Sequence, residues 1–137
     1  LLAHYIDVLR NQEKCSYVIM IAHLGLSQQI ALADKPGCEG VNYIMGGDTH
    51  ERVRKPIIGK YAKVVEPGAF GSFIGKLDLT IQNGKVIHDT YELVEVNSSK
   101  LKPDTNIENL LKEKELQIIE NNNNHKNNKT TYSSKIS

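Results

Sequence analysis

The sequence predicts a mixed α/β fold, and three patterns along the chain carry that prediction. Continuous apolar runs over residues 16–22 and 41–45 indicate two buried strands. The connection between them, Leu24 to Gly40, contains a helical stretch and is long enough to cross over between parallel neighbours. Residues 73–96 instead alternate between apolar and polar around Asn83-Gly84, which is typical of an antiparallel hairpin.

The first elements expected are a helix, a strand and a second helix. Residues 2–13 place apolar side chains at helical spacing with charged residues among them, which favours an amphipathic helix. Residues 16–22 are rich in β-branched side chains, so we expect a strand that is buried on both faces. Ser27 is placed to cap a short helix through about Ala33, which Pro36-Gly37 then breaks.

Further strands follow this helix. Residues 41–45 and 61–65 are each expected to form a short strand, and the second leads into a loop over residues 66–71. Residues 73–82 and 85–96 are expected to form the two strands of the hairpin. The Asn-Gly dipeptide between them is the strongest short-range signal of a hairpin.

The last part of the chain changes character. Residues 98–104 are polar and contain a proline, which indicates a linker. Asp104 or Thr105 is placed to cap a helix over residues 107–120. Residues 121–137 are almost all Asn, Lys, Ser and Thr, so they cannot bury enough apolar surface to offset their ordering entropy, and we expect a disordered tail.

Length and composition restrict the classes of protein. The chain has 137 residues, of which 39% are apolar and 24% charged, so it forms one domain at most and is neither collagen-like nor wholly disordered. Its net charge of +1 provides no basic footprint for a nucleic-acid polymer. No apolar run approaches the roughly 20 residues of a membrane span, so no transmembrane segment is expected.

Two of the expected strands end in a turn that carries histidine. His23 follows the first strand, and Asp48 and His50 follow the second. If these strands are parallel neighbours, their carboxyl ends meet at one edge of the sheet, where ligands bind in open α/β folds. Imidazole nitrogen and carboxylate oxygen together suit zinc, manganese, cobalt, nickel or iron better than calcium.

Other interpretations of these residues remain open. A lone histidine at a strand end is commonly a hydrogen-bonded loop residue, and Asp48-Thr49 could form an Asx turn or a cap. Three ligands are also too few for two metal ions. The basic cluster of residues 52–55 could face a phosphate, although a solvated face is favoured. Phe70 and Phe73 could line a substrate pocket, although packing in the core or against the hairpin is favoured.

Three motifs in the stretch from Tyr17 to Val96 resemble the calcineurin-like metallophosphoesterases, specifically their 5′-nucleotidase branch. That branch has a Ser/Ala-His-x-Gly turn, a Gly-His-Thr-His turn or variant, and a Pro-Gly-x-x-Gly turn before a Gly-x-Leu-x-Leu strand. The matching segments are Ala22-His23-Leu24-Gly25, Gly47-Asp48-Thr49-His50, Pro67-Gly68-Ala69-Phe70-Gly71 and Gly75-Lys76-Leu77-Asp78-Leu79. Their order and spacing match the C-terminal half of the catalytic domain.

The resemblance implies a site with two divalent metal ions. His23 and Asp48 would ligate one ion, and His50 the other. Asp48 departs from the histidine usual at its position, which shifts the metal preference toward harder ions or marks a catalytically lapsed variant. The Asp-x-His, Gly-Asp and Gly-Asn-His motifs of the family's first half do not occur in this sequence. We therefore expect the catalytic residues in a missing N-terminal half, without which the site is incomplete.

The resemblance also implies an architecture. Residues 1–97 would be the C-terminal half of a metallophosphoesterase α/β/β/α sandwich that ends in the β-hairpin. Residues 98–120 would be a linker and helix toward a missing second domain, followed by the disordered tail of residues 121–137.

The implied function is metal-dependent hydrolysis of nucleotide monophosphates or related phosphoesters by a metal-activated water. One alternative is a catalytically inactive fragment or degenerate homologue with at most a weak metal site. A further alternative is a thiosulfohydrolase-like enzyme of the same superfamily. The implied partner is a small-molecule phosphoester, and the implied location is periplasmic, secreted or at the cell surface.

Overall fold

The computed structural model describes the backbone of residues 1–133 and the side chains of residues 1–122. The chain divides into two compact units, one from Leu1 to Val96 and one that begins at Asn97. Of the elements in residues 1–133, the first unit contains all the strands and all the helices but one. Each unit is described by itself.

A four-stranded sheet forms the centre of the first unit, in the order β1-β2-β4-β3. Its strands are β1 (Ile19–Ile21), β2 (Tyr43–Met45), β3 (Ile57–Ile58) and β4 (Lys63–Val65). The strands β1, β2 and β4 run parallel, and β3 pairs with β4 in the antiparallel sense. The expected parallel pairing of the first two strands is therefore confirmed.

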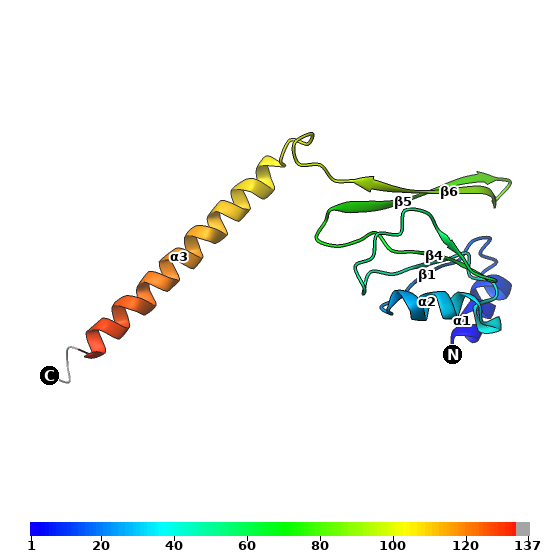
Figure 1. The fold of residues 1–137 in the computed structure, drawn as a ribbon, viewed down its shortest axis with the longest axis horizontal. Coiled ribbons are helices and arrows are strands. Elements are labelled where there is room, and N and C mark those ends of the chain that lie inside the picture. The colour runs from blue at the N-terminus through cyan, green and yellow to red at the C-terminus, as the bar shows by residue number, and fades with distance from the viewer. Residues whose placement is uncertain (134–137) are drawn as a thin grey trace. The chain divides into compact units, whose positions relative to one another are not determined.

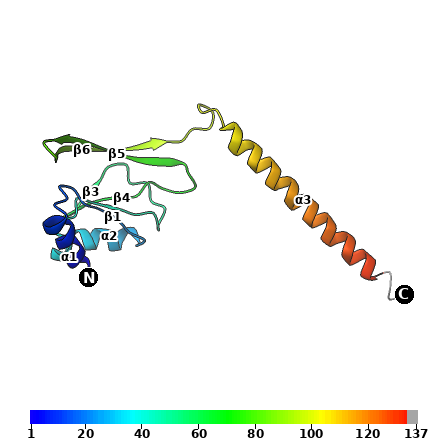
Figure 2. The ribbon, with the colours of Figure 1, turned by 180° about the vertical axis from the view of Figure 1, so that it is seen from behind.

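Helices cover one face of this sheet and a hairpin covers the other (Figures 1 and 2). Because side chains alternate along a strand, Ile44 and Val64 face the helices and join the main apolar cluster, while Tyr43 and Lys63 face the hairpin. The buried members of that cluster are Ile6, Val18, Ala33, Cys38, Val41, Ile44, Ala62 and Val64.

The hairpin consists of β5 (Phe73–Gln82) and β6 (Lys85–Glu95), as the sequence predicted. Asn83 and Gly84 have φ angles of 51° and 72°, which are the positive values that a type I′ turn requires. The hairpin is tied to the sheet through Asp89, which accepts hydrogen bonds from the Tyr43 hydroxyl at 2.9 Å and the Lys63 ammonium at 2.5 Å.

The two N-terminal helices differ in detail from expectation. α1 (Leu2–Asp7) continues into a π-helical turn over Val8–Gln12, so the predicted helix is present but widened at its end. α2 (Leu26–Ala33) begins after Gly25 and not after Ser27. The Gln28 side chain accepts a hydrogen bond from the Gly25 N–H at 3.2 Å, which makes Gly25 the N-cap residue. A 3₁₀ turn over Pro36–Cys38 then leads to β2.

The prediction that residues 16–22 form a strand buried on both faces is wrong. β1 is short and lies at the edge of the sheet, with the Ile21 side chain 88% exposed. An apolar run shows that burial is favourable, but it does not show whether a neighbouring layer covers both faces.

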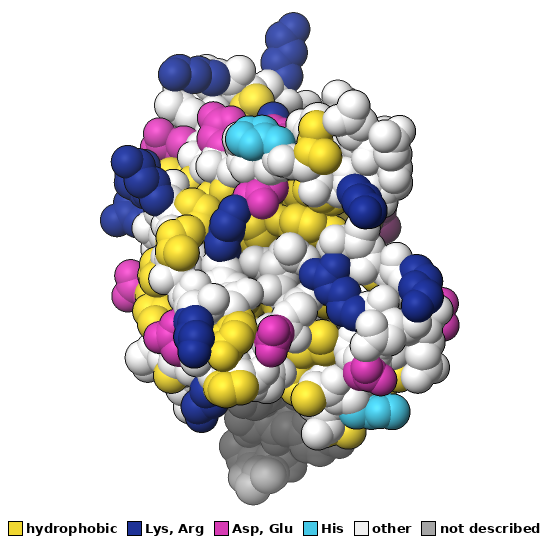
Figure 3. All heavy atoms as spheres, turned by 90° about the vertical axis from the view of Figure 1, so that its right-hand side faces the viewer, with side chains coloured by type: hydrophobic (Ala, Val, Ile, Leu, Met, Phe, Trp, Pro, Cys, Tyr) yellow, Lys and Arg dark blue, Asp and Glu magenta, His cyan; other side chains and the backbone are white. Residues whose placement is uncertain are grey.

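Figure 3 shows hydrophobic patches interspersed with side chains of both charges on one face of the molecule.

The second unit contains α3 (Thr105–Ser133) after a linker. Asp104 Oδ1 accepts hydrogen bonds from the Asn106 and Ile107 N–H groups at 2.9 and 3.2 Å, which confirms the expected cap. The helix passes its predicted end at Glu120, and the expected disordered tail is helical as far as Ser133, because no Gly or Pro interrupts it. Residues 134–137 of that tail lie outside the described residues. No helix among those described is long and apolar enough to cross a membrane.

Candidate metal centre

The two histidine-bearing turns lie at the same edge of the sheet. His23 follows β1, and Asp48 and His50 follow β2, its parallel neighbour. His23 Nε2 lies 3.4 Å from Asp48 Oδ1, although the residues are far apart in the chain. The structure thus brings together one imidazole and the carboxylate that the sequence singled out.

The donor set of this pair fits a divalent ion. Ligand bonds of about 2.0–2.2 Å at a tetrahedral angle place two donor atoms roughly 3.3–3.5 Å apart, and the His23–Asp48 distance falls in that range. The side chains are 90% and 40% exposed respectively, so both remain open to an incoming ion. Assignment of His23, Asp48 and His50 as metal ligands stays a prediction.

His50 lies apart from this pair in the structure. Its φ of 60° is unusual for a residue other than glycine, and its ring meets the Phe70 ring edge-on with 5.5 Å between centroids. Within the described part of the chain, no three His, Cys, Asp or Glu side chains gather closely enough to hold one ion. The structure therefore groups His23 with Asp48 and places His50 against a different neighbour.

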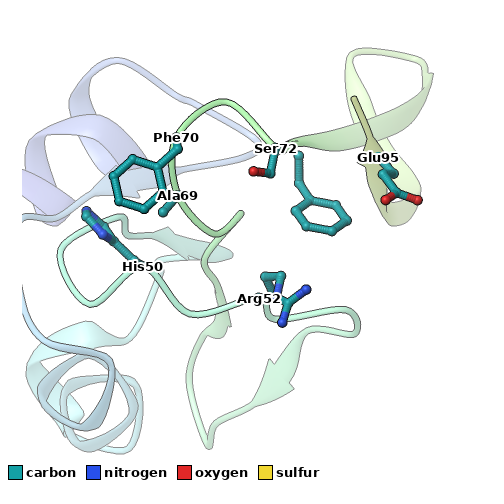
Figure 4. A pocket seen from close by; sticks show the side chains of 7 residues that line it. His50, Arg52, Ala69, Phe70, Ser72 and Glu95 are labelled. Atoms are coloured by element: carbon teal, nitrogen blue, oxygen red, sulfur yellow. The ribbon is translucent and has the colours of Figure 1, made fainter. Parts of the chain in front are cut away.

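A shallow pocket of about 360 Å³ lies beside His50 (Figure 4). Its lining residues are His50, Arg52, Ala69, Phe70, Ser72, Phe73 and Glu95. Phe70 is 95% exposed, so the favoured interpretation that it packs in the core or against the hairpin is wrong. The guanidinium groups of Arg52 and Arg54 each lie 5.7 Å from the Phe73 ring centroid, which is cation–π distance. The pocket thus combines aromatic surface with positive charge.

A second polar cluster, around Asp89, joins the hairpin to the sheet. Burial alone would raise the pKa of Asp89, but hydrogen bonds from Lys63 and Tyr43 outweigh it and leave the pKa below its ordinary value. Burial, together with the nearby Asp89 charge, raises the pKa of Tyr17 to about 12 and raises that of Tyr43 as well. These groups keep Asp89 ionised and the phenols neutral.

Sequence reasoning missed the polar side chains beneath the two turns. Glu66 and Gln29 are both fully buried, and Thr49 hydrogen-bonds to Glu66. The one available signal was Gln29, because it shares the apolar face of α2 with Leu26 and Ala33, where a polar residue needs an internal partner.

Comparison with known proteins agrees with the motifs. No protein-family model matches the chain. The trifunctional nucleotide phosphoesterase protein YfkN of Bacillus subtilis (strain 168) is 26% identical over 85 residues, which are 60% of this chain and 6% of YfkN. The solved structure of the sulfate thiohydrolase SoxB of Thermus thermophilus, in complex with glycerol, matches with a TM-score of 0.72 and 24% identity. That match covers 81% of this chain and 20% of SoxB.

The chain is similar in sequence to a nucleotide phosphoesterase and in fold to SoxB, which supports the resemblance to a C-terminal 5′-nucleotidase-like segment. The likeness to SoxB shows a shared fold, and the predicted α/β class is confirmed. The chain spans only a small part of the length of either relative.

Proposed function

We propose that this chain contributes part of the metal centre of a metal-dependent phosphoesterase of 5′-nucleotidase type, which hydrolyses nucleotide monophosphates or related esters. The observation that carries this function is the 3.4 Å approach of His23 Nε2 to Asp48 Oδ1 at one sheet edge. The name of the relative YfkN, a nucleotide phosphoesterase, supports the same class of substrate.

The proposed roles follow from donor chemistry and position. His23 and Asp48 hold one ion, and His50 contributes to a second. When bound, the two ions supply Lewis acidity to the phosphate and a nucleophilic water. Because three ligands cannot complete two coordination shells, the remaining ligands come from outside these residues. The isolated chain is therefore expected to bind metal without turning over substrate.

Calorimetric titration of the chain with Mn²⁺, and separately with Zn²⁺, tests these ligands. We expect His23→Ala and Asp48→Ala each to weaken binding at least about tenfold, since each removes one donor of a pair. His88→Ala provides a matched control, because this exposed histidine lies on β6 in the hairpin. Equal affinity in all four proteins would overturn the ligand assignment.

A hydrolysis assay with p-nitrophenyl phosphate, with and without Mn²⁺, tests whether the isolated chain turns over a phosphoester. Absence of turnover together with specific metal binding supports an incomplete phosphoesterase centre. Absence of any metal binding by the folded wild-type chain would instead favour a degenerate homologue. The shared fold with SoxB does not by itself favour a thiosulfate ester as substrate.

A further inference from the structure

Glu66 is a buried carboxylate directly after β4, and its partners are unusual. Its side chain is fully buried, and no Lys, Arg or His pairs with it among the side chains the structure describes. Burial of a carboxylate costs several kcal/mol unless hydrogen bonds compensate it. Its oxygens must therefore find donors elsewhere.

Those donors come from the turn that carries Asp48 and His50. The Thr49 hydroxyl lies 3.1 and 3.0 Å from the two Glu66 oxygens, and the Glu51 N–H donates to Oε1 at 3.1 Å. Thr49 and Glu51 alternate along the chain with Asp48 and His50. Glu66 thus holds every second residue of the turn that presents the candidate ligands.

The same network reaches the turn that carries His23. Thr49 Oγ1 accepts a hydrogen bond from the Leu26 N–H at 3.3 Å while its own proton is directed to Glu66. Gln29 Nε2 donates to the Leu24 carbonyl at 2.7 Å and to Glu66 Oε2 at 3.4 Å. Both Leu24 and Leu26 lie within three residues of His23. Each hydrogen bond in this network ends on the Glu66 carboxylate, the Leu24 carbonyl or Thr49 Oγ1, and each of these oxygens can accept it.

We propose that Glu66 is a positioning residue that holds the His23 turn and the Asp48–His50 turn in register, so that metal affinity depends on its hydrogen bonds. This role rests on the proposed metal site. It explains why two exposed side chains on separate turns lie close enough to share an ion. Partners that orient metal ligands typically change metal affinity about 10- to 100-fold when they are removed.

The decisive variant is Glu66→Gln, because it keeps the shape of the side chain but presents an amide donor to the Thr49 and Glu51 donors. Calorimetry should show Mn²⁺ affinity lower by about 10- to 100-fold, with the far-ultraviolet circular dichroism unchanged. Thr49→Val removes the hydroxyl at nearly constant volume and should weaken binding similarly. The double variant should bind Mn²⁺ no more weakly than either single variant, since the two substitutions disrupt the same hydrogen-bond network.

Asp89→Asn is the matched control. This carboxylate also accepts hydrogen bonds from two side chains, but it lies on β6 in the hairpin and contacts neither turn. We expect it to lower stability and leave Mn²⁺ affinity unchanged. The positioning role would be overturned if Mn²⁺ affinity fell in proportion to stability in all three variants, Glu66→Gln, Thr49→Val and Asp89→Asn.

A metal-free measurement separates this inference from the proposed function. In nuclear magnetic resonance spectra of the chain without metal, Glu66→Gln should speed hydrogen exchange of the Glu51 and Leu26 amides and shift the His23 ring signals. Wild-type chain that binds no Mn²⁺ would reject the metal site, and the amide and ring signals alone would then decide whether Glu66 holds the two turns. Unchanged signals would reject the positioning role even if the wild-type chain binds metal.

Discussion

At the scale of single residues, His50 and Phe70 share a conformation that their side chains disfavour. Both have a positive φ, and their rings are in edge-on contact where they line the pocket. The left-handed region costs roughly 1–2 kcal/mol for a residue with a Cβ, and less for Asn. His50 is itself a candidate ligand, and backbone strain of this kind is found preferentially at functional sites.

Phe70→Asn should raise the free energy of unfolding by about 0.5–1 kcal/mol, because Asn tolerates the positive φ and the lost ring is 95% exposed. Urea denaturation of the two proteins measures the change. Asn83→Phe is the reciprocal control, since Asn83 has a φ of 51°, and it should be destabilising. A destabilised Phe70→Asn protein would mean that the contact with His50 outweighs the backbone strain.

Gly46 and Gly47 form a second residue-scale test, because they are neighbours with different surroundings. A Cβ at Gly46 would overlap the buried Gln29 carboxamide, whereas a Cβ at Gly47 has nothing within 4 Å. Gly46→Ala should therefore lower the free energy of unfolding by about 1–3 kcal/mol. Gly47→Ala should change it little, as judged by the same urea titration. Similar losses in both variants would contradict close packing of Gln29 under the turn.

The candidate ligands could be identified from the sequence, but the network beneath them could not. His23, Asp48 and His50 each follow a strand-like apolar run, so local pattern was enough to locate them. Glu66 joins residues that are 15 to 37 positions away in the chain. Such contacts depend on the order of strands in the sheet, which no local pattern encodes.

At the scale of elements, prediction succeeded where a local signal was complete. The Asn83-Gly84 turn and the alternation on either side specify the hairpin without help from the rest of the fold. β3 has only two residues and is held by β4, so its sequence carries no signal of its own. The apolar run at residues 16–22 contains a strand of three residues, because pairing with β2 and not hydrophobicity sets the length.

Asp104 at the start of α3 offers an element-scale prediction. Asp104→Ala removes the acceptor for two N–H groups of the first turn and should cost about 1 kcal/mol of helix stability. Circular dichroism at the helical minimum should show a weaker signal for this variant. Glu115→Ala is the control, because alanine is favourable in a helix interior and the signal should not fall. An unchanged signal for Asp104→Ala would indicate that the cap does not limit the helix.

At the scale of the first unit, three layers meet through few polar contacts. The helices and sheet share an apolar cluster, whereas the sheet and hairpin are joined by Asp89 with Tyr43 and Lys63. The apolar cluster itself contains no carboxylate, although the buried Glu66 carboxylate accepts a hydrogen bond from Gln29 on α2. The polar interface must respond to pH, because its geometry requires an ionised carboxylate and a neutral phenol.

Stability of the first unit should consequently have a window with an acid and an alkaline limit. The Asp89 pKa is lowered on folding, so its contribution is present above about pH 4 and is lost as the pH falls through the folded pKa. The Tyr17 and Tyr43 pKa values are raised, so their contribution is present below about pH 10 and is lost as the pH rises. Urea midpoints measured across this range should fall at both ends.

Asp89→Asn should flatten the decline of the urea midpoint in acid. Asp78→Asn, which removes an exposed carboxylate on β5, should leave that decline nearly unchanged. A decline of equal steepness in both variants would show that Asp89 does not determine the loss of stability in acid.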